Sequence, residues 1–231
     1  MIEQVFDHKE MVVTPAALRI QELQERVQRM QGTPATHPLD THTAFAGLLA
    51  MRTGSTYGVD SASLAMALMA GPSQAGAWSA VVGSRDFGIE AAAAAGVDLS
   101  RTILVPDPGD QWVEVTAALL DVLTVVVVKP AKQVSEGTAA RLRARLRQRG
   151  ATLIAWGEWP RCEARLSVVE SSWMGVGRGH GHLAARRCTV AVQRGTAPAR
   201  MREMWLPDES MRIRAIEPAV AAAPVTALRV G

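Results

Sequence analysis

The residues of this sequence that are best placed to do chemistry lie in one segment, residues 54–70, which read GSTYGVDSASLAMALMA. A loop that binds nucleotide phosphates reads G-x-x-x-x-G-K-[ST], because its backbone amides surround the phosphates and its lysine contacts the terminal ones. If Gly54 is the first glycine of such a loop, Val59 stands at the second glycine and Asp60 at the lysine. If Gly58 is instead the second glycine, Val59 stands at the lysine and Asp60 at the hydroxyl residue.

A third alignment contains no loop at all. Residues 55–59 would then form a strand, and Asp60 or Ser61 would cap the helix that follows. In all three alignments the lysine is missing, and an aspartate lies near the place for phosphate. The segment therefore predicts a fold of the nucleotide-binding type that has lost its catalysis.

The elements that must position this segment alternate along the chain. The sequence predicts strands at 55–59, 77–82, 102–105, 124–128 and 151–156, and helices at 61–70, 87–95, 113–123 and 135–149. Gly71-Pro72 is expected to stop the first of these helices. The valine run at 124–128 lacks polar alternation, which is typical of a central parallel strand that is covered on both faces. This order predicts the α/β class, with a mostly parallel central sheet flanked by helices.

The pattern changes after residue 160. Two β segments at 163–172 and 187–194 are joined by WMGVGRGHGH at residues 173–182, which predicts a C-terminal antiparallel hairpin. Residues 201–206 read as a last edge strand. The expected organisation is a separate N-terminal helix with its linker at 1–43, a core at 44–206 and a flexible tail at 207–231.

Three segments carry a resemblance to a known family. They read AGLLAMRTGSTYGVDSASLAMALMAGPSQAGAWSAVVG, AAAAAGVDLSRTILVPDPGDQW and ESSWMGVGRGHGHLAARRCTVAVQR, and the likeness runs from about residue 40 to residue 206. The chain resembles the RecA core, and more closely the ImuA family in its actinobacterial branch; it is also similar to short RecA-like cell-division inhibitors. The resemblance implies a non-catalytic accessory subunit of the translesion-synthesis mutasome. Its implied partners are an inactive Y-family polymerase-like subunit, indirectly an error-prone replicative-type DNA polymerase, and RecA.

The resemblance also implies that three further functional positions are lost. Arg85 stands where RecA-like ATPases have a carboxylate that activates water, with Asp86 one residue out of register. Lys129 stands where an aspartate would hold magnesium, and a cation there would repel the metal. Trp156 replaces a polar residue that senses the terminal phosphate. We therefore expect neither enzymatic activity nor a cofactor.

Charge is distributed unevenly along the chain. Residues 130–200 carry thirteen basic and four acidic side chains, whereas residues 1–129 carry eight basic and fourteen acidic ones. This separation favours an anionic partner, with single-stranded DNA the first candidate. The alternative is a solvated arginine-rich surface, which the low number of lysines, three in the chain, also fits. The arginines that alternate along 141–149 fit a solvated helix first and a DNA-facing one second.

Candidate binding residues fall into two groups. Those expected to contact DNA lie around the glycine-rich turn of the hairpin: Trp173, Arg178, His180, His182, Arg186 and Arg187. The structural alternative is a turn whose glycines take positive φ and whose tryptophan packs beneath it. Those expected to contact a protein partner are apolar residues of the terminal segments: Leu18, Leu23, Val27, Met30, Met211, Ile213 and Ile216.

Other function classes find little support in the sequence. The two cysteines, Cys162 and Cys188, do not match the paired spacing of zinc sites, so we expect no metal. No signal peptide or membrane span is recognisable, which predicts a cytoplasmic, nucleoid-associated protein. Two functional alternatives stay open: a DNA-stimulated ATPase of the recombinase class, and a protein-only inhibitor that resembles the cell-division inhibitors.

Overall fold

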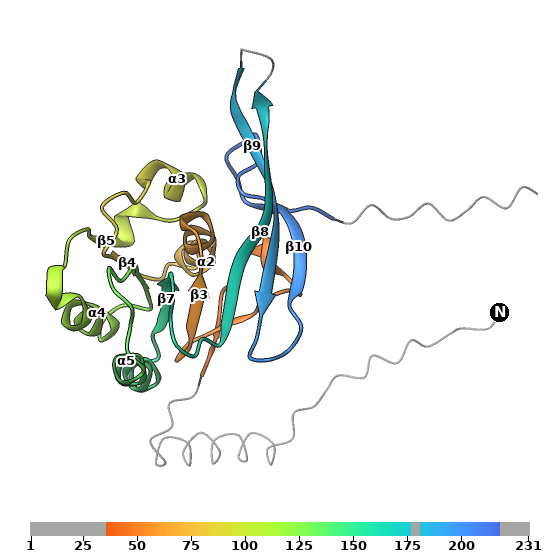
Figure 1. Cartoon of the computed structure of the whole chain (residues 1–231). Helices are drawn as coiled ribbons and strands as arrows, with labels where there is room; N and C mark the ends of the chain where they lie inside the picture. The colour runs from red at the N-terminus through yellow and green to blue at the C-terminus, as the bar shows by residue number, and fades with distance from the viewer. Residues whose placement is uncertain (1–35, 177–180, 218–231) are drawn as a thin grey trace, which may run out of the picture.

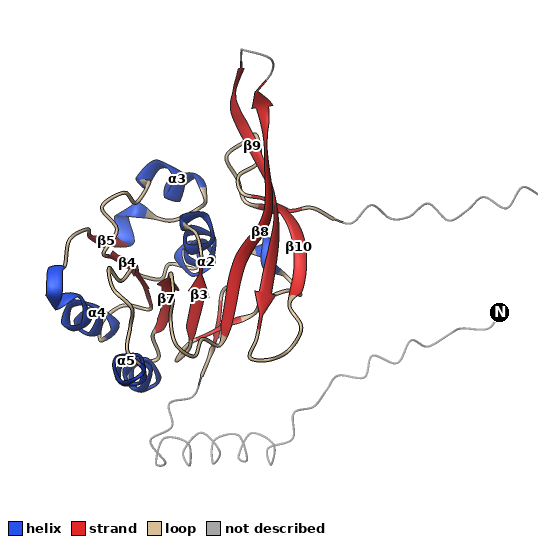
Figure 2. Cartoon of the chain, viewed as in Figure 1, coloured by secondary structure: helices blue, strands red, loops and turns tan. Residues whose placement is uncertain are grey.

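A mixed sheet of nine strands organises the residues that the computed structural model describes, 36–176 and 181–217 (Figures 1 and 2). Five strands run parallel: β3 (Thr56–Val59), β4 (Ser79–Val82), β5 (Thr102–Val105), β6 (Val125–Val128) and β7 (Thr152–Trp156). Four more follow: β8 (Ala164–Val176), which is also parallel to β3, and then β9 (Gly181–Gln193), β10 (Arg200–Trp205) and β11 (Arg214–Ala215), each antiparallel to the strand before it. The order across the sheet is β11-β10-β9-β8-β3-β7-β6-β4-β5. The predicted α/β class, with a mostly parallel sheet and C-terminal antiparallel strands, is confirmed.

Four helices cover the parallel part of the sheet. They are α2 (Ala62–Gln74), α3 (Ile89–Ala94), α4 (Trp112–Leu120) and α5 (Glu136–Arg149). The valines of β6 show how the two faces are filled, since successive side chains of a strand point to opposite sides. Val125 and Val127 join the apolar cluster beneath α2, whereas Val126 and Val128 join the cluster beneath α5. All four are buried, as the unbroken valine run predicts.

Helix α2 continues past Gly71-Pro72, where the sequence predicted its end. Pro72 lies in the last turn, so the hydrogen bond that it cannot donate is lost close to the end of the helix. Gly71 is needed for packing, because a β-carbon there would lie 2.5 Å from the backbone nitrogen of His42. This contact holds the segment before β3 against the helix. In that segment β1 (Pro38–Leu39) pairs with β2 (Met51–Arg52), within what the sequence assigned in part to a linker.

The hairpin of β8 and β9 is longer than predicted, since each strand has thirteen residues. Most of residues 173–182, expected as a connecting turn, therefore lie in strands. Gly175 permits this because it has φ +100°, and a β-carbon there would lie 2.4 Å from the carbonyl oxygen of His182. The outer part of the hairpin, residues 171–176 and 181–186, projects beyond the rest of the sheet (Figure 1). We call this part the hairpin arm.

Residues 207–217, which the sequence assigned to a flexible tail, belong to the folded sheet. The carboxylate of Asp208 accepts hydrogen bonds from the backbone of Ser210 and Arg212, which closes a turn. The turn returns the chain so that Ile213 is buried and β11 pairs with β10. Residues 1–35, with the predicted helix at 15–31, and residues 218–231 lie outside the described part. No helix in the described ranges is both long and apolar enough to span a bilayer.

Candidate functional site

The connection between β3 and α2 contains two residues, Asp60 and Ser61. Ser61 is the N-cap residue of α2, and its side chain makes no capping hydrogen bond. A phosphate-binding loop needs several consecutive backbone amides that converge on one point, and two residues do not supply them. The structure therefore corresponds to the third alignment of this segment, in which the strand passes directly into the helix.

The two glycines that could have formed a phosphate loop have other positions. Gly54 precedes β3 and has φ +74°, and a β-carbon there would lie 3.4 Å from Cγ of Arg147. Gly58 is buried within β3, where a β-carbon would lie 3.0 Å from the sulfur of Cys162. Neither glycine follows the strand, where a phosphate loop would stand. Both are explained by close packing.

Asp60 joins the end of β3 to β8. Its Oδ2 accepts a hydrogen bond of 2.9 Å from the backbone nitrogen of Val168. Val59, the residue before Asp60, pairs with Leu166 of β8, so this hydrogen bond lies next to the last pairing of the two strands. Asp60, which the sequence placed near the expected phosphate position, therefore extends the contact between β3 and β8.

Lys129 occupies the carboxyl end of β6 and contacts the ends of both neighbouring strands. Its Nζ lies 3.1 Å from Oδ1 of Asp86, after β4, and 4.1 Å from the ring centroid of Trp156, at the end of β7. The hydroxyl of Ser84 donates a further hydrogen bond of 3.0 Å to the same Asp86 oxygen. These two donors, Lys129 first, hold the pKa of Asp86 below its usual value. The ammonium is therefore neutralised within the protein.

Further ion pairs cross the same edge of the sheet. Arg85, after β4, pairs with Asp107, after β5, and Nζ of Lys132 lies 3.6 Å from Asp110. They flank a hollow of about 410 Å³, at the point where the helices after β4 and β6 pass to opposite faces of the sheet. Ligands of open α/β sheets bind at such a point. Here the charged groups neutralise one another, and the described residues contain no cluster of three or more potential metal ligands.

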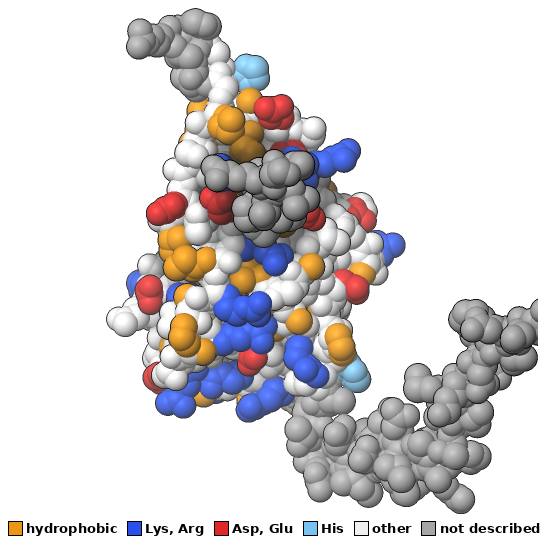
Figure 3. Space-filling model, turned by 90° about the vertical axis from the view of Figure 1, so that its right-hand side faces the viewer, with side chains coloured by type: hydrophobic (Ala, Val, Ile, Leu, Met, Phe, Trp, Pro, Cys, Tyr) orange, Lys and Arg blue, Asp and Glu red, His pale blue; other side chains and the backbone are white. Residues whose placement is uncertain are grey.

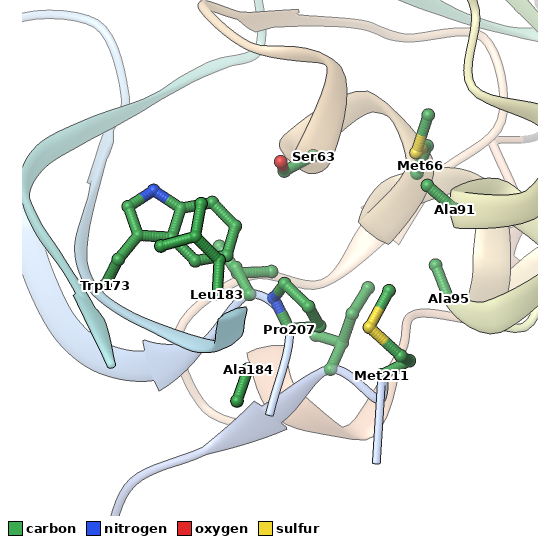
Figure 4. A pocket seen from close by; sticks show the side chains of 11 residues that line it. Ser63, Met66, Ala91, Ala95, Trp173, Leu183, Ala184, Pro207 and Met211 are labelled. Atoms are coloured by element: carbon green, nitrogen blue, oxygen red, sulfur yellow. The ribbon is translucent and has the colours of Figure 1, made fainter. Parts of the chain in front are cut away.

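A second hollow, of about 290 Å³, lies between the hairpin arm and the helices α2 and α3 (Figure 4). Trp173 and Leu183 lie side by side on the arm, Met66 and Ser63 come from α2, and Met211 comes from the segment before β11. The lining is mostly apolar. Trp173, Leu183 and Met211 are each about half exposed, at 49%, 54% and 48%. Exposed large apolar side chains that gather around a hollow are typical of a surface that contacts another molecule.

The residues predicted to contact DNA are only partly together. The guanidinium of Arg186 lies 5.8 Å from the ring centroid of Trp173 and donates a hydrogen bond to the hydroxyl of Ser171. Arg187 pairs with Glu203 at 2.6 Å, on β10. Both arginines lie within β9 and not around its turn, because the strand is longer than expected. His182 is exposed at the start of β9, and Arg178 and His180 lie outside the described residues.

The residues predicted to contact a protein partner separate in the same way. Met211 lines the apolar hollow, Ile213 is buried, and Ile216 lines a different recess beside Trp205. Leu18, Leu23, Val27 and Met30 lie outside the described residues. Sequence reasoning missed Leu183 and Met66, since an apolar residue in a strand or helix carries no signal that it will line a hollow.

The arginine-rich helix α5 is held mainly by contacts within the protein. Arg145 donates to both carboxylate oxygens of Asp121, after α4, and Arg149 donates to one of them at 3.1 Å. The hydrogen bond from Arg145 is the largest cause that lowers the pKa of Asp121 to about 2. Arg143 donates to backbone carbonyl oxygens before β8. Three of the alternating arginines therefore have partners within the protein.

Comparison with known proteins places this architecture in a family. The chain is similar to "Uncharacterized protein Rv3395c" of Mycobacterium tuberculosis, with 39% identity over 108 residues, 46% of this chain and 53% of that protein. The match thus spans about half the length of that relative. The family model described as MT3502 N-terminal domain matches residues 45–161, from the end of the first 3-10 helix through β7. Neither description names ImuA or RecA, so that resemblance stays a prediction. The chain belongs to the MT3502 N-terminal domain family.

Proposed function

We propose that this protein is a non-catalytic, RecA-like accessory protein of DNA-damage tolerance. In this role it binds a polymerase-like partner and DNA during error-prone translesion synthesis, as its resemblance to the ImuA family implies. The RecA-like part of the proposal is supported by the central position of β3, by the α2 helix that follows it, and by the antiparallel hairpin that ends the sheet.

The observation that carries the non-catalytic assignment is the two-residue connection between β3 and α2. Without a loop of backbone amides, the terminal phosphates of a nucleotide have no cradle. Lys129 supports the same assignment, because it stands at the end of β6, where a metal-binding carboxylate would be needed, and it is paired with Asp86. Its ion pair with Asp86 connects the segments after β6 and β4, at the edge of the sheet where a nucleotide and its metal would bind.

Binding of a protein partner is supported by the apolar hollow beside the hairpin arm. A two-stranded ribbon that extends away from its sheet exposes both faces and is only marginally stable by itself. Trp173 and Leu183 would be covered when a partner packs there. Tryptophan in such a position is frequently among the residues that dominate the binding energy of an interface.

A nucleotide-binding experiment tests the non-catalytic assignment. We expect the melting temperature of the purified chain to be the same with and without ATP and magnesium, and single-stranded DNA to induce no phosphate release. A ligand at about one hundred times its Kd would stabilise the fold by about 2.7 kcal/mol, which a melting curve detects. A clear shift, or DNA-stimulated phosphate release, would favour the recombinase-class ATPase instead.

A genetic experiment tests the cellular role. Deletion of the gene in its host is expected to abolish damage-induced mutagenesis, and complementation with L183D to fail, because an aspartate would place a charge in the apolar hollow. The matched variant V122D changes an exposed apolar residue on the opposite side of the sheet, and it is expected to complement. Altered cell length with normal mutagenesis would favour the cell-division-inhibitor alternative.

A further inference from the structure

Four exposed arginines lie at the end of the sheet opposite the hairpin arm. They are Arg52, at the end of β2, Arg147 on α5, and Arg194 and Arg200, which flank the turn between β9 and β10. We call this group the arginine band. Figure 3 looks at the molecule from the side of β10, and Lys and Arg side chains gather there in the lower half, away from the arm.

The elements around the start of β3 place these arginines along one end of the sheet. Gly54, which packs against Arg147, is two residues from Arg52. The backbone nitrogen of Arg52 donates a hydrogen bond of 2.8 Å to the hydroxyl of Tyr57. Arg194 follows Gln193, which pairs with Arg165 on β8, and Arg165 pairs in turn with Gly58 on β3. The band therefore crosses from α5, past the start of β3, to the turn between β9 and β10.

Several other arginines of the described residues have acidic partners, whereas the arginine band has none among these residues. Arg145, Arg161, Arg187 and Arg214 each lie within an ion pair, with Asp121, Glu136, Glu203 and Asp208. Within residues 36–176 and 181–217, no carboxylate lies within ion-pair distance of any of the four band arginines. Glu163 is an exposed acidic residue in the neighbourhood. Among the described residues, positive charge therefore exceeds negative charge on this surface.

We propose that the arginine band binds the phosphate backbone of a nucleic acid. The planar guanidinium matches the geometry of phosphate oxygens, and such contacts supply affinity without sequence preference. The inference rests on the DNA-binding part of the proposed function and changes its location. It places the nucleic acid at the end of the sheet away from the arm, so that the apolar hollow stays accessible to a protein partner.

The test measures binding to fluorescent single-stranded and duplex oligonucleotides over a series of salt concentrations. The variant R194Q/R200Q is compared with R161Q/R214Q, which removes the same number of charges from arginines that are paired with Glu136 and Asp208. We expect the band variant to bind at least tenfold more weakly than the wild type and the control to change little. The slope of log K against log salt should decrease by about 0.7 to 0.9 for each lost phosphate contact. Circular dichroism confirms that both variants are folded.

Other outcomes separate this inference from the proposed function. If the wild type binds DNA and the two variants weaken equally, the arginine band is not the site, and the proposed function still stands. If the wild type binds neither oligonucleotide at low salt, the band assignment and the DNA-binding part of the proposed function both fail. If the band variant retains DNA binding but loses its protein partner, the band contacts an acidic protein and the proposal is overturned.

Discussion

The ammonium of Lys129 lies 4.1 Å from the centre of the Trp156 ring, at the edge of the sheet where parallel strands end. Both residues stand at positions where the resemblance to RecA-like ATPases implies groups that hold metal or sense phosphate. Here the two side chains contact each other, and Asp86 completes the arrangement from the neighbouring strand. In this protein these side chains form a contact that joins the segments at the ends of three neighbouring strands.

The first prediction concerns this contact. The substitution K129M removes the charge that faces both Trp156 and Asp86, and we expect a loss of about 0.5–1 kcal/mol in the free energy of unfolding. The pKa of Asp86 should rise toward its ordinary value, because its largest stabilising partner is gone. Urea unfolding and NMR titration measure the two effects. The variant K132M is the control, since that lysine is exposed and pairs with an exposed aspartate; equal losses in both variants would contradict the prediction.

The second prediction concerns the turn after β4. Gly83 has φ +82°, and a β-carbon there would lie 2.4 Å from the carbonyl oxygen of Lys129. The substitution G83A therefore combines an unfavourable backbone conformation with a clash against the backbone, and we expect it to cost about 2–4 kcal/mol. G109A is the matched variant, because Gly109 also has positive φ but open space around it. It should cost about 1–2 kcal/mol. Similar losses in thermal unfolding would show that the close approach does not matter.

The third prediction concerns acid stability. The pKa of Asp121 is lowered from 3.8 to about 2, chiefly by the hydrogen bond from Arg145. Because the folded-state pKa lies below the unfolded one, the stabilisation is complete above about pH 4, declines as pH falls, and is lost below about pH 2. The variant D121N should therefore show a shallower loss of stability over this range than the wild type.

The measurement for Asp121 is urea unfolding at a series of pH values from neutral to strongly acidic. D110N provides the matched change, because it removes an exposed carboxylate that lies 3.6 Å from Lys132. We expect D110N to follow the wild-type curve. A D121N curve parallel to that of the wild type would mean that the contacts of Arg145 and Arg149 with this carboxylate do not contribute.

The fourth prediction concerns the end of β3. The substitution D60A leaves the backbone nitrogen of Val168 without its hydrogen-bond acceptor, which we expect to cost about 1 kcal/mol. D60N retains an acceptor oxygen and should cost less. Hydrogen exchange at the Val168 amide measures the effect locally and should accelerate in D60A only. Unchanged exchange in D60A would show that this carboxylate does not support β8.

Much of the fold could be predicted because its signals are local. The strand expected at 102–105 has those bounds in the structure, and the helix expected at 135–149 is present as Glu136–Arg149. Ser135 caps its start through the backbone nitrogen of Thr138, and Gly150 ends it with φ +67°. Such signals depend on neighbours within one helical turn and on hydrophobic periodicity, both of which can be read without knowledge of the rest of the chain.

The candidate sites were harder to predict because their contacts join distant parts of the chain. Lys129 meets Asp86 over 43 positions, and Arg145 meets Asp121 over 24. The sequence indicated that Lys129 could not hold a metal. It did not indicate that Lys129 would pair with Asp86, which lies one residue from the position expected for a water-activating carboxylate. It also could not show which arginines would be paired and which, such as Arg194 and Arg200, would lie at an exposed end of the sheet.

By itself, then, the sequence determined the succession of most strands and helices, the burial of β6 on both faces and the absence of a lysine between β3 and α2. The tertiary structure alone decided the length of the hairpin arm, the return of residues 207–217 to the sheet, and the partner of each charged side chain. The physical reason is that backbone preference and hydrophobic periodicity act between near neighbours. Exposure and charge pairing depend instead on which segments the completed fold brings together.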